Sequence, residues 1–89
     1  GIEIQHATLN PHDLNSLGNL STELVFVSCK FNIPISAQVS FPATRTVSFQ
    51  TGDLNNQSLL KFCDSPKLTR IRLAGTDVSV DGVEAFSGV

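Results

Sequence analysis

The amino-acid sequence predicts an α/β fold in which short units, each a strand, a turn and a short helix, stack into a solenoid. Three observations lead to this prediction. Four apolar-x-apolar triplets recur at a spacing of 22 to 24 residues. Five residues after each triplet another apolar residue appears, followed at once by Asn or Ser. In three units a pair of apolar residues, three apart, comes next. Self-similarity at such a period is the sequence signature of a repeat architecture.

The triplets are predicted to be short strands, because alternate residues of a strand point to opposite faces. Stacked in register, they form a short parallel β-sheet on the concave face of the solenoid. The prediction is a single domain over residues 1–89, with repeats at about 1–20, 21–43, 44–66 and 67–89. The triplets are Ile2-Glu3-Ile4, Leu24-Val25-Phe26, Val47-Ser48-Phe49 and Ile71-Arg72-Leu73.

A short helix is expected on the convex face of most units. Asn and Ser suit a helix N-cap, where the side chain accepts a hydrogen bond from a free backbone N–H. Pro11 fits the first helical position and Asp13 suits the positive end of the helix. The cap positions are Asn10, Asn32, Asn55 and Ser79, each preceded by the apolar residue Leu9, Phe31, Leu54 or Val78. The apolar pairs are Leu14 and Leu17, Leu59 and Phe62, and Val83 and Phe86.

The second unit departs from this pattern. From Ile33 to Phe41 every second residue is apolar, which is the period of an extended chain. Pro34 also lacks the N–H that a helix interior or a central strand would use. We therefore expect an extended or irregular convex segment there instead of a helix.

These residues resemble the leucine-rich repeat family. Residues 68–78 are similar to its pattern L-x-x-L-x-L-x-x-N/C/T-x-L, and Leu24 to Phe31 matches the latter part, with Cys29 at the Asn/Cys position. The stretch 78–86 resembles the convex half of cysteine-containing, F-box-adaptor-like or ribonuclease-inhibitor-like repeats. The chain departs from the pattern at the first leucine, where Ser21 and Thr44 stand, and at the Asn/Cys/Thr position, where Ala7 and Gly52 stand. The resemblance implies a protein-binding module, and substrate recognition in a ubiquitin-ligase adaptor.

Composition and motifs argue against several other classes of protein. The formal net charge of −2 disfavours nucleic acid and anionic membrane surfaces, which bind clustered basic residues. The longest apolar stretch, Leu24 to Val27, is too short to span a bilayer. No metal-ligand spacing, phosphate loop, nucleophile elbow or spaced carboxylate pair is present. We therefore expect a chain that is no enzyme and carries no metal or cofactor.

The cysteines and the sequons bear on the compartment. Cys29 and Cys63 are too few for a disulfide scaffold and are interpreted as buried thiols. Two N-x-S/T triplets begin at Asn19 and Asn56, and glycosylation there would matter only in a secreted protein. The prediction is a cytoplasmic or nuclear protein, and secretion remains an open alternative.

The outward positions of the strands are the candidate site for a protein partner, since solenoids commonly bind on the concave face. The aligned positions form three columns across the repeats. Val25 and Val27 would be a central apolar pair, with arginines toward one end of the sheet and glutamates toward the other, a charge gradient that can orient a partner. The candidate residues are Glu3, Gln5, Glu23, Val25, Val27, Ser48, Gln50, Arg70 and Arg72.

Two alternative functions stay open at this point. No polar capping unit is visible at either end of the repeats, so the chain would be a fragment needing flanking repeats, or would self-associate. One alternative is therefore a structural subunit that completes a larger assembly through its ends and strand edges. The other is a small β-sandwich with a binding role, in which the segments after Asn10 and Ser79 would be loops.

Overall fold

The computed structural model describes residues 1–61 and 65–79, which form a small α/β fold. Two short helices accompany strands that all run parallel. In chain order the elements are β1 (Ile2–Gln5), β2 (Thr8–Leu9), α1 (Pro11–Leu20), β3 (Glu23–Phe31), β4 (Thr46–Gly52), α2 (Asn56–Leu60) and β5 (Arg70–Ala74).

The sheet has the strand order β1-β3-β4-β5, and β2 pairs with the far end of β3. The strands are in register at the expected positions, so that Ile2, Leu24, Val47 and Ile71 are neighbours in one row. The row formed by Ile4, Phe26, Phe49 and Leu73 lies two residues further along. The parallel sheet predicted from the triplets is therefore confirmed.

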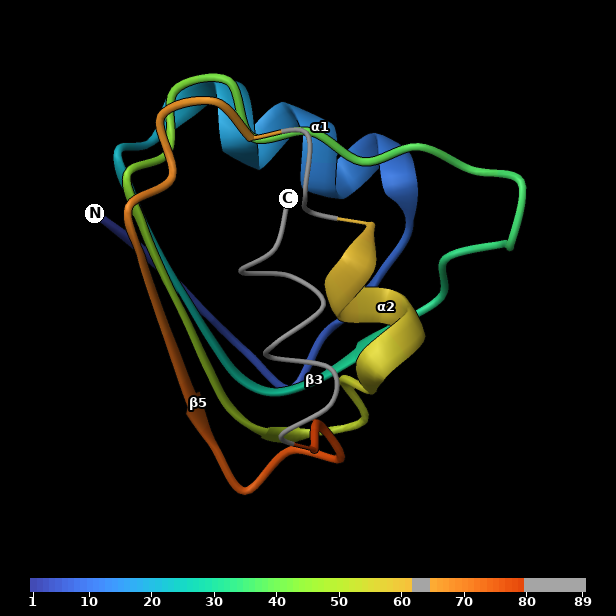
Figure 1. The fold of residues 1–89 in the computed structure, drawn as a ribbon. Helices are drawn as coiled ribbons and strands as arrows, with labels where there is room; N and C mark the ends of the chain where they lie inside the picture. Colours follow the sequence, from blue (N-terminus) through green and yellow to red (C-terminus); the bar gives the residue numbers. More distant parts are fainter. Residues whose placement is uncertain (62–64, 80–89) are drawn as a thin grey trace.

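The sheet forms one wall of the molecule and the helices lie on the other sides (Figure 1). The strands lie close together at the upper left of the view and fan apart toward the bottom, where β5 lies outermost. After each strand the chain turns sharply away from the sheet. Helix α2 lies on the side that follows this turn, and α1 lies on the side along which the chain returns to the next strand. The hydrophobic core lies between these walls.

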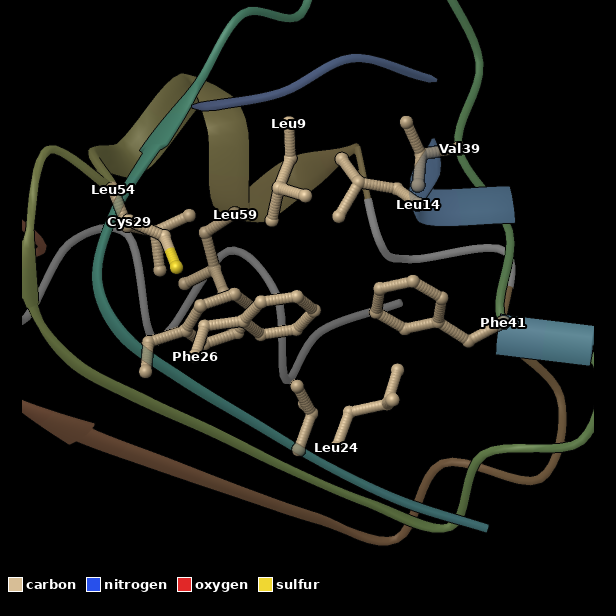
Figure 2. Close-up of a cluster of buried hydrophobic side chains, with 11 residues drawn as sticks. Leu9, Leu14, Leu24, Phe26, Cys29, Val39, Phe41, Leu54 and Leu59 are labelled. Carbon is tan, nitrogen blue, oxygen red and sulfur yellow. The ribbon is translucent and has the colours of Figure 1, made fainter. Parts of the chain in front are cut away.

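The core consists of apolar side chains that point inward from the sheet, from both helices and from the segment before β4. Figure 2 shows Phe26, Phe41, Leu14, Leu24 and Leu59 converging on one centre. The ring of Phe26 stacks on that of Phe49 with centroids 5.4 Å apart. Phe31 meets both rings edge-on, at 5.5 Å in each case. Aromatic pairs in these geometries stabilise a core beyond the area they bury.

Both described helices begin at the predicted N-caps. The side chain of Asn10 accepts from the Asp13 N–H at 2.9 Å, and the Asp13 carboxylate accepts in return from the Asn10 N–H. Asn55 accepts from the Ser58 N–H at 2.9 Å at the start of α2. Each bond satisfies a backbone donor that the first turn of a helix leaves free.

Residues 32–45 contain neither helix nor strand, as the period-two pattern predicted. Val39 and Phe41 are buried, whereas Ile35 is 87% exposed. Phe41 packs so closely on α1 that a side chain at Gly18 would overlap it. Gly18 is thus required by the close approach of the two segments.

Ser21 and Thr44, which replace the first leucine of two units, are buried with satisfied hydroxyl groups. The Ser21 hydroxyl donates to the Glu23 carbonyl at 2.6 Å. The Thr44 hydroxyl donates to the Ser21 carbonyl at 2.8 Å, from one unit to the preceding one. These bonds explain how polar residues occupy core positions without the penalty of an unpaired buried group.

Some sequence predictions fall outside the described residues. They are the helix after Ser79, with Val83 and Phe86, and the placement of Phe62 and Cys63. Among the described residues, the single parallel sheet and the helix after Asn10 differ from the β-sandwich considered above.

Candidate interaction surface on the sheet

The strand register places the nine candidate residues on one face of the sheet. Leu24 and Phe26 point into the core, so the alternate residues of β3 point outward. One outward column joins Glu3, Val25, Ser48 and Arg72. The second joins Gln5, Val27, Gln50 and Ala74, and the third joins Glu23, Thr46 and Arg70. We refer to these three columns as the sheet face.

The centre of the sheet face is apolar and partly covered. Val25 and Val27 are half-buried, so they are less exposed than the sequence interpretation assumed. Ser48 is only 6% exposed, because its short side chain lies between those of Val25 and Arg72. Its hydroxyl also accepts from the Gln50 amide at 3.4 Å. Ser48 therefore offers little accessible surface, whereas the two valines are half-exposed and Gln50 is exposed.

Opposite charges lie on the two sides of the sheet face. Glu3 and Glu23 are exposed on β1 and β3, and Arg70 and Arg72 are exposed on β5. The Glu3 carboxylate accepts from the Gln5 amide at 2.6 Å, which directs it along the face. Since neighbouring strands are about 4.8 Å apart, β1 and β5 are separated by roughly 14 Å. That distance exceeds the screening length of about 8 Å at physiological salt, so the exposed charges of Glu3 on β1 and Arg72 on β5 are largely screened from each other.

A row of residues with positive φ forms the corner at which the strands leave the sheet. His6, Ser28 and Thr51 have φ values of 55, 53 and 50°, and Gly75 has 67°. Each of these residues directly follows a member of the second outward column, Gln5, Val27, Gln50 or Ala74. The turns of successive strands therefore lie side by side. The sequence pattern did not predict this row, to which Gly75 belongs. Its alignment with His6, Ser28 and Thr51 at the repeat spacing is the signal that identifies the row.

The Cys29 thiol is buried beside this corner. It donates weakly to the carbonyl groups of Ile4 and Val27, at 3.4 and 3.5 Å. The bond to Ile4 links two successive units, which is a structural role and leaves the thiol inaccessible. Cys29 therefore agrees with its interpretation as a buried thiol.

A second candidate site, which sequence reasoning missed, is a groove of about 490 Å³ on the convex side. Ile35 and Leu60, two of the three large apolar side chains that are exposed among the described residues, line this groove. The Lys61 ammonium group donates to the carbonyl groups of Ile35 and Ala37 and so ties this segment to the end of α2. The groove is lined by Phe31, Ile33, Ile35, Asn55, Gln57, Ser58, Leu60 and Lys61.

The two sequon asparagines have different surroundings. Asn19 is exposed on α1, and its amide donates to the Asn15 carbonyl at 2.9 Å. Asn56 is half-buried and exchanges two hydrogen bonds with Ser79, at 2.8 and 2.9 Å. A glycan at Asn56 would break this link, so Asn19 is the more accessible of the two.

The described residues bear on membrane insertion and on metal binding. No helix in that part of the chain has both the length and the apolar character to cross a membrane. Residues 1–61 and 65–79 also contain no group of three or more His, Cys, Asp or Glu residues that could hold a metal ion.

The chain matches no model of a known protein family, and neither a curated protein nor a solved structure matches it.

Proposed function

We propose that the chain is a solenoid of leucine-rich repeats. Three features support this proposal. Successive strands pair in one register at offsets of 22, 23 and 24 residues. Asn caps a helix after two of the strands, and Cys29 bonds backbone carbonyl groups at a position that the family pattern gives to Asn or Cys. The F-box-like part of the resemblance depends on residues 78–86, most of which lie outside the described residues.

The function that the geometry supports best is binding of a protein partner through the sheet face. The observation that carries this proposal is the alignment of an apolar centre between opposite charges on one continuous sheet. A partly covered pair of valines can be buried by a partner, and apolar burial supplies most of the affinity of such contacts. The flanking Glu3, Glu23, Arg70 and Arg72 then select the orientation of the partner through charge complementarity.

The predicted partner carries basic groups opposite β1 and acidic groups opposite β5, around an apolar contact. Arginine suits this role, because its guanidinium group makes bidentate contacts with carboxylates. A role as the substrate-recognition part of a larger adaptor is one form of this proposed function.

Affinity capture from extracts of the source cells tests the proposal. The wild-type chain is compared with Val27→Glu and Arg72→Glu on the sheet face, and with Ile35→Glu in the convex groove. Ile35→Glu is a matched control, since it also replaces a β-branched apolar residue by glutamate. The captured protein is then purified and its affinity is measured for each variant.

We expect Val27→Glu and Arg72→Glu to lose the partner while Ile35→Glu retains it. A partner that Ile35→Glu loses and the other two variants retain would place binding in the convex groove and contradict the proposal. Far-UV circular dichroism of each variant shows whether the fold is preserved.

A further inference from the structure

Three arginines gather where β4 and β5 begin. Arg70 and Arg72 are exposed on β5, and Arg45 is exposed directly before the first residue of β4. Segments 42–52 and 65–76, which contain the two strands, have no Asp or Glu residue. Positive charge is therefore concentrated on this part of the surface, although the formal net charge of the whole chain is −2. We refer to the three residues as the arginine patch.

Backbone hydrogen bonds hold Arg45 beside the start of β5. The Arg45 carbonyl accepts from the N–H groups of Thr69 and Arg70, at 2.9 and 3.2 Å. The Thr69 hydroxyl donates to the same carbonyl at 3.3 Å. Arg45 was not among the candidate residues predicted from the sequence, because it precedes the triplet of its unit. The pairing of the two strands nevertheless brings it next to Arg70.

The spacing of the patch matches an extended chain. Arg70 and Arg72 are alternate residues of one strand and lie on the same face, so their backbone positions are about 6.6 Å apart. Alternate residues of any other extended segment have the same spacing and also share a face. In a helix, residues three or four apart have Cβ atoms about 5–6 Å apart, which fits the two arginines less well.

We infer that the arginine patch binds an extended acidic segment of the partner, with carboxylates at alternate residues over Arg70 and Arg72. A guanidinium group suits a carboxylate, because its planar N–H groups match both oxygens. Arg45 adds a third guanidinium group to the carboxylate over Arg70. The inference rests on the proposed function, since it names the part of the partner that meets the positive side of the sheet face.

The rest of the sheet face favours a short acidic segment over a nucleic acid. A phosphate backbone carries its charge evenly and binds through an extended row of basic groups. Across the sheet from the arginine patch the surface is first apolar, at Val25 and Val27, and then negative, at Glu3 and Glu23. A polyanion that continued past the patch would meet these groups, whereas an acidic segment of a few residues ends before them.

NMR titration of the full 89-residue chain with synthetic peptides tests the inference. Three peptides of Ser and two Glu residues differ only in whether none, one or three serines separate the glutamates. The peptide with one serine between them should bind most tightly, and its affinity should fall as salt is raised. Arg45→Gln, Arg70→Gln and Arg72→Gln should each weaken its binding about threefold, the effect of losing one exposed charge pair. Lys30→Gln is the control, since Lys30 is exposed near the far end of β3.

The inference is overturned if no peptide binds, if the three peptides bind equally well, or if Lys30→Gln weakens binding as much as the arginine variants do. Tightest binding of the peptide with three serines between the glutamates would indicate a helical segment and also contradict it. The peptides contain no apolar residue, so their binding does not depend on the valines. If they fail to bind while Val27→Glu still loses the captured partner, only this inference fails. If the partner is lost by Ile35→Glu alone, the proposed function fails, whatever the peptides show.

Discussion

The hydroxyl groups of Ser28 and Thr51 lie 2.6 Å apart and are hydrogen-bonded, and both residues have positive φ. Non-glycine residues seldom adopt this conformation, and a β-branched residue such as Thr51 does so least readily. The hydrogen bond joins the turn at the end of one strand to the turn of the next strand. It therefore stabilises both residues in a conformation that is otherwise unfavourable. The row of corners turns every strand away from the sheet at the same level, which keeps the sheet face continuous.

Gly75 continues this row, and its replacement tests the role of the corners. Gly75→Thr should destabilise the fold by about 1–2 kcal/mol, because a Cβ is unfavourable at φ 67°. The new side chain would also crowd Thr51, whose Cγ2 lies 3.3 Å from the added Cβ. Urea denaturation measures the change. Ala74→Thr is the matched control, since its exposed strand position tolerates threonine, and an equal loss in both variants would contradict the account.

The aromatic stack predicts the largest loss of stability. Phe49→Ala removes a ring that stacks on Phe26 and meets Phe31 edge-on, and it leaves a cavity in the core. Such substitutions cost about 3–5 kcal/mol, which is a large fraction of the stability of a small domain, about 5–15 kcal/mol. Phe49→Leu should retain the fold at a smaller cost. An unfolding midpoint unchanged by Phe49→Ala would show that the rings do not support the core.

Asn10, Asn32 and Asn55 occupy equivalent positions in their units, but replacing each by alanine should change the stability of the fold by different amounts. Asn10→Ala and Asn55→Ala should each cost about 1 kcal/mol, because each removes the acceptor that caps a helix. Asn32→Ala should have little effect, since no helix follows Asn32. Chemical denaturation of the three variants checks this order. Equal losses at all three positions would mean that these asparagines stabilise the fold by some means other than capping.

The buried hydroxyl of Thr44 predicts a cost that side-chain volume does not explain. Thr44→Val keeps the shape of the side chain but removes the donor to the Ser21 carbonyl, at a cost of about 1–2 kcal/mol. Thr69→Val is a control, because the Thr69 hydroxyl donates at an exposed site, to the Arg45 carbonyl at 3.3 Å. If Thr44→Val were as stable as the wild-type chain, the bond between the units would be unimportant.

The apolar period allowed the strands, their register and the outward columns to be predicted, because a slip by one residue would expose every inward side chain. The start of α1 could also be predicted from Asn10 and Pro11. Asn32 has the same apolar residue before it, but Pro34 disfavours helical backbone at Ile33, so no helix begins there. The sequence was therefore sufficient to predict the structure wherever neighbouring residues determine the backbone conformation.

Features that depend on contacts between units could not be predicted. Nothing in the sequence pairs the Thr44 hydroxyl with Ser21, or shows that Val25 and Arg72 cover Ser48. The positive φ at His6, Ser28 and Thr51 is imposed by the corner, since these residue types do not prefer it. The convex groove was missed because it forms between α2 and an irregular segment whose path depends on packing.

Binding of a protein partner on the sheet face is the central claim, and site-specific photocrosslinking tests it most directly. A photoreactive amino acid is placed at Val27 in one variant and at Ile35 in another, and each is exposed to light with the captured partner. Binding on the sheet face predicts a covalent adduct at position 27 and none at position 35. An adduct at position 35 alone would contradict it and assign binding to the convex groove.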